Sequence, residues 1–116
     1  YFPGHGKGED AMKILWCSNE QGKFWEILDD MYASQDLMEA NNVAGLKAVA
    51  TSKGVDSAAL ESCLASGKYN GRFQSETAQG SATGLTGTPA FVVNGKRVDG
   101  AVSYSEMKQM IDAALG

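Results

Sequence analysis

The dipeptide Asn94-Gly95 constrains the fold of this chain more than any other feature. A type I′ turn needs positive φ at both central residues, and Asn-Gly is the pair that best meets this need. Phe91, Val92 and Val93 precede it with strand-forming side chains, and residues 96–99 follow as a matching segment. The sequence therefore predicts a β-hairpin. Because a lone hairpin is marginally stable and sheets usually hold about four to six strands, further strands are needed.

The stretch before the hairpin has a helical pattern. Between residues 9 and 83, apolar side chains recur three or four positions apart in about five groups, which is the spacing of one helix face. Asp56 is a good N-cap, and Val55 and Leu60 beside it have the spacing of a hydrophobic staple. Four clear groups and a weaker fifth are Met12, Leu15 and Trp16; Phe24, Ile27, Leu28 and Met31; Leu46, Val49 and Ala50; Leu60, Cys63 and Leu64; and Tyr69 with Phe73.

A capping box opens the last predicted helix. Ser103 and Glu106 have the required spacing, and Val102 and Met107 have that of its staple. One amphipathic face follows, formed by Met107, Met110, Ile111, Ala114 and Leu115. The chain therefore ends as strand, tight turn, strand and helix.

The beginning of the chain supplies at most one more strand. Tyr1-Phe2 fits the end of a strand that Pro3 stops. The chain opens without Met and without a charged-then-apolar signal segment, so we expect it to be part of something longer. One or two strands are expected upstream of residue 1 or from another chain.

Size and charge limit the classes of function. The chain has 116 residues, which suits one domain, and ten basic against fourteen acidic residues give a net charge of −4. This balance argues against nucleic acid as a partner, because phosphate binding needs clustered Lys and Arg. No apolar run approaches the roughly 20 residues of a membrane span.

The two cysteines, Cys17 and Cys63, form no Cys-x-x-Cys motif. Neither falls at the start of its predicted helix, where the helix dipole would stabilise a thiolate. Each is therefore either a small buried apolar residue or, in an exported protein, one half of a structural disulfide. A metal site is not expected, since one His and two distant Cys do not match zinc spacing. No cofactor is expected either.

His5 lies in the loop Gly4-His5-Gly6-Lys7-Gly8. A general base needs a positioned partner, and the sequence shows none, so an exposed loop residue is the favoured interpretation. The loop lacks the Ser or Thr after Lys and the glycine spacing of a phosphate-binding P-loop.

The segment Gly87-Thr88-Pro89 enters the first hairpin strand. A trans bond before Pro89 is the ordinary case, and only about 5–6% of such bonds are cis. A cis bond would turn the chain sharply and hold the Thr88 backbone outward, where an extended peptide can pair with it by strand addition. The local residues do not choose between the two.

Three separated blocks carry a family resemblance. TGTPAFVVNG at residues 86–95, with Gly100 and the terminal helix, resembles the cis-proline loop and closing strand–strand–helix unit of thioredoxin-fold proteins. EQGKFWE at 20–26, with YFP at 1–3 ahead of it, and CLASGKY at 63–69 resemble the DsbA-like thiol:disulfide oxidoreductases. These blocks follow the family's order over nearly the whole chain.

The resemblance implies an α/β thioredoxin-like fold without its N-terminal strand and active-site helix. Residues 1–116 would be the C-terminal part of one domain, with a helical insertion at about 9–83 and the cis-proline loop and closing unit at 84–116. Thr86, Gly87, Thr88 and Pro89 would bind substrate, and Thr88 and Pro89 would adjoin the redox pair. The family's catalytic Cys-x-x-Cys would lie outside this chain. Cys17 and Cys63 match positions where some relatives carry a second, non-catalytic disulfide.

The implied function is that of part of a periplasmic or otherwise extracytoplasmic bacterial oxidoreductase. It would oxidise or isomerise disulfides of cysteine-containing client proteins and be recycled by a redox partner. An exposed sheet edge would favour pairing with a second copy. The alternative is a non-enzymatic thioredoxin-like module that binds peptides or acts as a chaperone. A glutathione-transferase-like enzyme is disfavoured, because it needs a larger helical domain after the closing unit.

Overall fold

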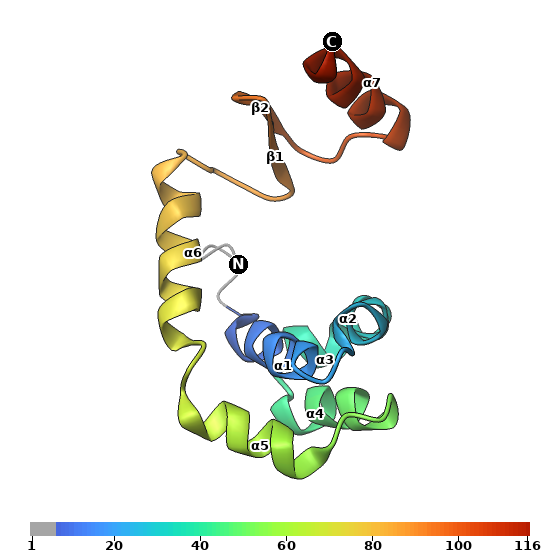
Figure 1. Ribbon diagram of the computed structural model, residues 1–116, viewed down its shortest axis with the longest axis vertical. Helices are drawn as coiled ribbons and strands as arrows, with labels where there is room; N and C mark the ends of the chain where they lie inside the picture. The colour runs from blue at the N-terminus through green and yellow to red at the C-terminus, as the bar shows by residue number, and fades with distance from the viewer. Residues whose placement is uncertain (1–6) are drawn as a thin grey trace.

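The computed structural model describes residues 7–116, in which helices precede a hairpin and a last helix (Figure 1). The predicted strand at Tyr1-Phe2 and the loop residue His5 lie outside the described residues. The elements in chain order are α1 (Glu9–Asn19), α2 (Phe24–Ala33), α3 (Gln35–Glu39), α4 (Val43–Ser52), α5 (Ser57–Ser66), α6 (Asn70–Ala82), β1 (Ala90–Val93), β2 (Lys96–Asp99) and α7 (Tyr104–Leu115).

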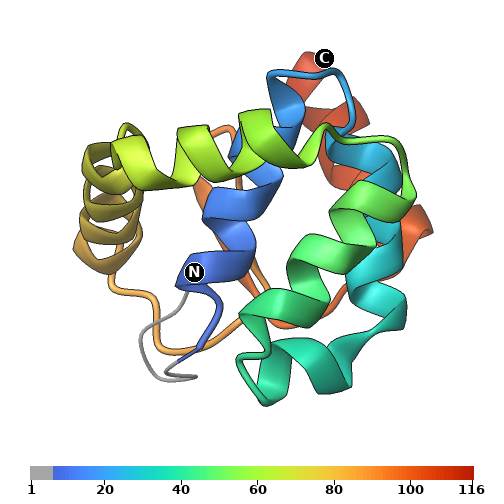
Figure 2. The same cartoon turned by 90° about the horizontal axis from the view of Figure 1, so that it is seen from below.

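The hydrophobic core lies among the first five helices. Helix α1 is at its centre and packs against α2, α4 and α5, as both views of the ribbon show (Figures 1 and 2). Ile14, Ile27 and Leu46 are fully or almost fully buried there, as the helical spacing predicts. The buried cluster is Ala11, Ile14, Leu15, Cys17, Ile27, Met31, Leu46, Ala50, Val55, Leu60 and Cys63.

Side-chain caps set several helix starts. The Asp56 carboxylate accepts a hydrogen bond from the Ala59 N–H at 2.8 Å, as its N-cap position predicts. Asn42 caps α4 in the same way through the Gly45 N–H. At α7 the Ser103 and Glu106 side chains form the reciprocal capping box that the sequence predicts.

The hairpin has the turn and register that Asn94-Gly95 predicts. Val93 pairs with Lys96 across the turn, and Ala90 pairs with Asp99 at the other end. Asn94 and Gly95 have φ values of 49° and 77°, which the type I′ turn requires. Within residues 7–116 the sheet consists of these two antiparallel strands.

Two features differ from the sequence interpretation. Helix α3 is an additional short helix, so six helices rather than about five precede the hairpin in the described part of the chain. Helix α7 forms as predicted, but its apolar face is not buried; Ile111 is 42% and Leu115 82% exposed. Among residues 7–116 the hairpin packs against α7, and it leaves this face exposed.

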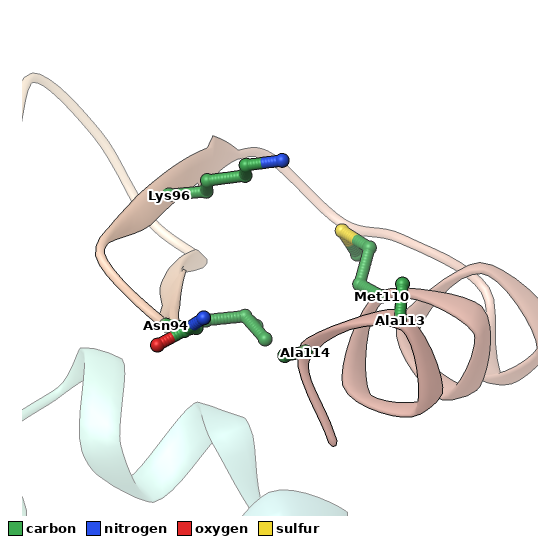
Figure 3. A pocket seen from close by; sticks show the side chains of 6 residues that line it. Asn94, Lys96, Met110, Ala113 and Ala114 are labelled. Carbon is green, nitrogen blue, oxygen red and sulfur yellow. The ribbon is translucent and has the colours of Figure 1, made fainter. Parts of the chain in front are cut away.

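The contact between the hairpin and α7 is loose. A cavity of about 180 Å³ separates them, with Asn94 and Lys96 on the hairpin side and Met110, Ala113 and Ala114 on the helix side (Figure 3). The closing unit therefore has little core of its own.

Helix α6 connects the helical core to the closing unit. It runs along one side of the molecule from the end of α5 towards the hairpin, and the molecule measures 47 × 26 × 25 Å (Figure 1). The segment 83–89 then leads from the end of α6 into β1. This segment contains the residues that the resemblance assigns to substrate binding.

Candidate functional site

The Thr88–Pro89 segment lies where the closing unit meets the helical core. The peptide bond between these residues is cis. The Pro89 carbonyl accepts a hydrogen bond from the Gly100 N–H at 2.9 Å, which continues the ladder beyond the Ala90–Asp99 pair. One end of the segment is thereby fixed to the sheet.

Thr88 borders an apolar cavity of about 270 Å³. Helices α1, α2 and α3 supply most of the wall, and Thr88 approaches from the loop before β1. The lining residues are Lys7, Gly8, Ala11, Met12, Leu15, Leu28, Met31, Tyr32, Met38 and Thr88. A cavity of this size and character accepts an apolar side chain.

Helical spacing explains how the wall is assembled. Met12 and Leu15 lie three residues apart on α1, and Leu28 and Met31 do so on α2, so each pair lies on one helix face. Three of the lining side chains are methionines, whose flexible thioethers adapt to differently shaped partners. The Lys7 ammonium donates to the Glu39 carbonyl at 2.6 Å at one edge of this wall.

The four residues expected to bind substrate have different positions. Thr88 is exposed and lines the cavity. Thr86 and Pro89 are also exposed, and Gly87 is half-buried, but none of the three is part of the cavity wall. The structure thus brings one of the four to the apolar surface of the helices.

Cys17 and Cys63 are joined by a disulfide that links α1 to α5. Their exposed fractions are 2% and 8%, and no free cysteine is left in the chain. Both cysteines lie within helices and belong to the buried core, and neither lines the cavity at Thr88. The bond has the burial of a structural cross-link.

A polar cluster covers one side of this disulfide. The Glu20 carboxylate accepts a hydrogen bond from the Tyr69 hydroxyl at 2.6 Å and forms an ion pair with Lys68. Its Oε1 lies 3.7 Å from the Cys63 Sγ. The Lys68 and Tyr69 hydrogen bonds lower the pKa of Glu20 below its ordinary value of 4.5, and the Glu20 carboxylate raises the pKa of Tyr69 above 10.0.

The other two sequence blocks of the family resemblance, residues 20–26 and 63–69, lie in the helical part and stabilise it. The Gln21 side chain binds both backbone polar groups of Asp56. Its Oε1 accepts from the Asp56 N–H at 2.8 Å, and its Nε2 donates to the Asp56 carbonyl at 3.5 Å. Phe24 packs against the core and lies edge-on to Trp25. These blocks hold the turn between α1 and α2 against α5 and α6.

A metal site and a membrane span are two further features, and neither is present among the side chains and helices of residues 7–116. No three His, Cys, Asp or Glu side chains in this range are grouped so that they could hold a metal ion. None of the helices in the same range has both the length and the apolar character needed to cross a bilayer.

The family model described as thioredoxin matches residues 1–113. The chain belongs to the thioredoxin family. Its α/β architecture, with a helical insertion and a small antiparallel hairpin, agrees with a thioredoxin fold.

Three bacterial proteins named Na⁺/H⁺ antiporter NhaA resemble this thioredoxin-family chain. The one from Herminiimonas arsenicoxydans is 26% identical over 114 residues, covering 98% of this chain and 18% of the relative. That from Mycolicibacterium gilvum is 26% identical over 100% of this chain and 19% of the relative. That from Nitrosospira multiformis is 23% identical over 91% of this chain and 17% of the relative. The chain spans less than a fifth of the length of these curated relatives.

No solved structure shows a significant match to this thioredoxin-family chain.

Sequence reasoning missed two parts of the site. The apolar wall combines residues as distant as Met12 and Thr88, and nothing in local spacing predicts that they meet. The residues beside Arg97 in β2 do not predict that its side chain binds the carbonyl groups directly after α6. Met12 and Met31 were predicted only as core positions of their helices, and Met38 was not predicted at all.

Proposed function

We propose that these 116 residues belong to a DsbA-like thiol:disulfide oxidoreductase that acts outside the cytoplasm on cysteines of client proteins. Residues 1–116 form the C-terminal part of its thioredoxin-like domain, with 9–83 as the helical insertion and 84–116 as the cis-proline loop and closing unit. The family membership supports the general chemistry. The resemblance of the three sequence blocks supports the narrower assignment.

The redox pair of this protein is a Cys-x-x-Cys outside these 116 residues. A client thiolate attacks the disulfide of that pair and forms a mixed disulfide, and a second client thiolate then displaces the pair. The client loses two electrons and two thiol protons, and the pair gains the electrons as two thiols. Both cysteines of this chain are already bonded to each other, which supports an outside source for the pair.

The observation that carries the proposal is the place of Thr88 at the apolar cavity. A client segment that lies along residues 86–89 brings its side chains to the wall formed by Met12, Met31 and Tyr32. Apolar side chains are what an unfolded client exposes, and they are the group that this wall accepts. Thr86, Gly87, Thr88 and Pro89 then act as the substrate-side loop.

The location outside the cytoplasm is supported by the Cys17–Cys63 bond, since structural disulfides persist in oxidising compartments. In such a compartment a redox-recycling partner is needed to restore the pair after each client.

A second candidate is a thioredoxin-like module that binds peptides without catalysis. It is favoured by the absence of a free thiol in the chain and by relatives that are named as antiporters. On this proposal the module is one segment of a larger transporter and needs no redox pair.

A client-oxidation assay separates the two candidates. A reduced, unfolded client with two cysteines is incubated with this chain and, separately, with the protein encoded by the complete gene, and loss of thiols is followed. Turnover only by the longer protein, together with a Cys-x-x-Cys upstream of residue 1, supports the oxidoreductase. A complete gene without that pair supports the binding module, and turnover by the 116-residue chain alone contradicts the external redox pair.

A further inference from the structure

Arg97 bridges the closing unit and the end of α6. Its Nη1 donates to the Gly84 carbonyl at 2.7 Å and to the Thr83 carbonyl at 3.2 Å. Its Nε donates to the Asp99 carboxylate at 2.7 Å, which fixes the plane of the guanidinium. A side chain of β2 thus binds the two residues with which the segment 83–89 begins.

The end of α6 is well suited to receive this cation. The last carbonyl groups of a helix have no donor within the helix, and the helix dipole places partial negative charge there. Helix α6 has no basic residue in its own last turn. Arg97 therefore supplies from another element the positive charge that this helix end lacks, and its N–H groups bind the two carbonyls that directly follow the helix.

Gly84 suits the turn after α6, because its φ of 73° lies in the left-handed region that favours glycine. A Cβ built on it would be in ordinary contact with the Arg97 Nη1 at 3.5 Å, so the guanidinium lies directly against this residue. Leu85, the next residue, lies against α6, because its Cδ1 is 3.5 Å from where a Cβ on Gly80 would be. The chain is thus held to α6 over residues 83–85.

The far end of the segment is held by β2 as well. The Pro89 carbonyl is bonded to the Gly100 N–H directly after β2. Between the two fixed ends lie Thr86, Gly87 and Thr88, and Thr88 is the one that lines the cavity. A segment with three residues between fixed ends has few alternative conformations. The hydrogen bonds of Arg97 at its start therefore affect where Thr88 lies.

We infer that Arg97 is a positioning residue: by tying β2 to the carbonyl groups at the end of α6, it sets the place of Thr88 against the apolar wall of the helices. The inference rests on the proposed function only in that the positioned loop binds client segments. Asp99 has a supporting part, because it orients the guanidinium. Arg97 itself does not line the cavity and needs no contact with the client.

Arg97→Ala, Arg97→Lys and Asp99→Asn in the full chain test this role. Lys96→Ala is the matched control, since it removes the same charge from the adjacent residue, whose side chain points to the opposite face of the hairpin. The probe is a dye-labelled unstructured peptide with one S-methylated cysteine between two leucines. Hydrogen exchange of the Thr83, Gly84 and Gly100 amides, which are hydrogen-bonded at the two ends of the segment, is measured on the same samples.

Arg97→Ala is expected to weaken peptide binding about tenfold and to speed exchange of the Thr83, Gly84 and Gly100 amides, while the amides of α1 and α5 exchange as before. Arg97→Lys is expected to fall between wild type and Arg97→Ala, because an ammonium keeps the charge but lacks the fork that reaches two carbonyls and Asp99. Lys96→Ala is expected to match wild type. This graded result is not expected from a side chain that only adds global stability.

Unchanged exchange of the Thr83, Gly84 and Gly100 amides in Arg97→Ala overturns the positioning role, whether or not peptide binding changes. If Arg97→Ala does not fold, Arg97→Lys and Asp99→Asn decide by the same two measurements. Failure of the wild-type chain to bind the peptide counts against the proposed function instead, and the exchange result then decides on Arg97 independently.

Discussion

Glu20 shows how one exposed carboxylate can join three parts of the helical core. It lies directly after α1, and it binds Tyr69 and Lys68 in the turn between α5 and α6. Trp16 is buried beneath this cluster, with the Tyr69 ring on one side and the Arg72 guanidinium 4.6 Å from its ring centre. The residues around Glu20 thus fix the start of α6, the helix that carries the closing unit.

The Glu20–Tyr69 contact should make stability depend on pH at both ends of the scale. The folded-state pKa of Glu20 is lowered, chiefly by Lys68, so its contribution is present above the unfolded value near 4.5 and is lost as the pH falls through the folded value. The folded-state pKa of Tyr69 is raised by Glu20, so its contribution is present below 10.0 and is lost as the pH rises through the folded value.

Urea midpoints measured from acid to alkaline pH check this prediction. Glu20→Gln is expected to weaken the fall of the urea midpoint at both acid and alkaline pH relative to wild type. Tyr69→Phe is expected to remove the alkaline fall and to reduce the acid one. Parallel curves for wild type and Glu20→Gln would show that the carboxylate has no such role.

Tyr32 tests whether the apolar cavity receives client side chains. It lines the cavity and is 63% exposed, so Tyr32→Glu should fold and place a carboxylate beside the wall. An apolar side chain entering next to a charge desolvates it, and binding of the leucine-containing peptide is expected to weaken about tenfold. Fluorescence anisotropy of the labelled peptide measures the change.

Tyr104 offers the matched control for this experiment. It is 83% exposed on α7 and is not part of the cavity wall, so Tyr104→Glu makes the same chemical change elsewhere. Equal affinities for the two variants would mean that peptides bind without using the cavity.

At the scale of elements, the caps determine where the helices of the core begin. Asp56 caps α5, and α5 carries Leu60 and Cys63 into the core. Asp56→Ala is expected to lower the free energy of unfolding by about 1 kcal/mol, because one N–H at the start of α5 loses its acceptor. Asp56→Asn keeps that acceptor and should cost less. Chemical denaturation of the three proteins would show the order, and equal stabilities would contradict it.

The sequence predicts those elements that depend on neighbouring residues. The capping box at Ser103, the N-cap at Asp56 and the turn at Asn94-Gly95 each need only a few adjacent side chains, and all three are found. Helix α3 has five residues, too few to show a period, and its apolar residues Leu37 and Met38 gave no pattern.

Contacts between distant residues were not predictable from spacing. Cys17 and Cys63 were consistent with two buried thiols or with one disulfide, and only the packing of α1 on α5 brings them together. The meeting of Thr88 with Met12 and Met38 depends in the same way on how α6 and the hairpin are placed. Such placement is set by the whole core, and no short window of sequence contains it.

At the scale of the molecule, the disulfide and the core stabilise the helical part together. The bond closes a loop with a sequence separation of 46 residues, for which loop-closure entropy corresponds to about 4 kcal/mol. The double variant with Cys17→Ala and Cys63→Ala is expected to lower the free energy of unfolding by roughly this amount. Wild type unfolded under a dithiol reductant should have nearly the same urea midpoint as the double variant. A midpoint equal to that of oxidised wild type would contradict a structural role.

The closing unit has no comparable core. All the buried residues of the described chain lie between Ala11 and Phe73, whereas β1, β2 and α7 have none. Apolar groups on both faces of the hairpin remain accessible, with Val92 57% exposed. A sheet of two strands, as residues 7–116 form it, is marginally stable, and its edges favour another strand.

Native-state hydrogen exchange should therefore divide this chain into two parts. The amides of α1 and α5 are expected to exchange only through global unfolding, while those of β1, β2 and α7 exchange through a local opening of much lower free energy. If a second copy pairs with the edge of β1, protection of the hairpin will rise with protein concentration, together with the mass measured by light scattering. Equal protection in the two parts at every concentration, with a constant monomeric mass, would show that the hairpin and α7 are stable without a further strand.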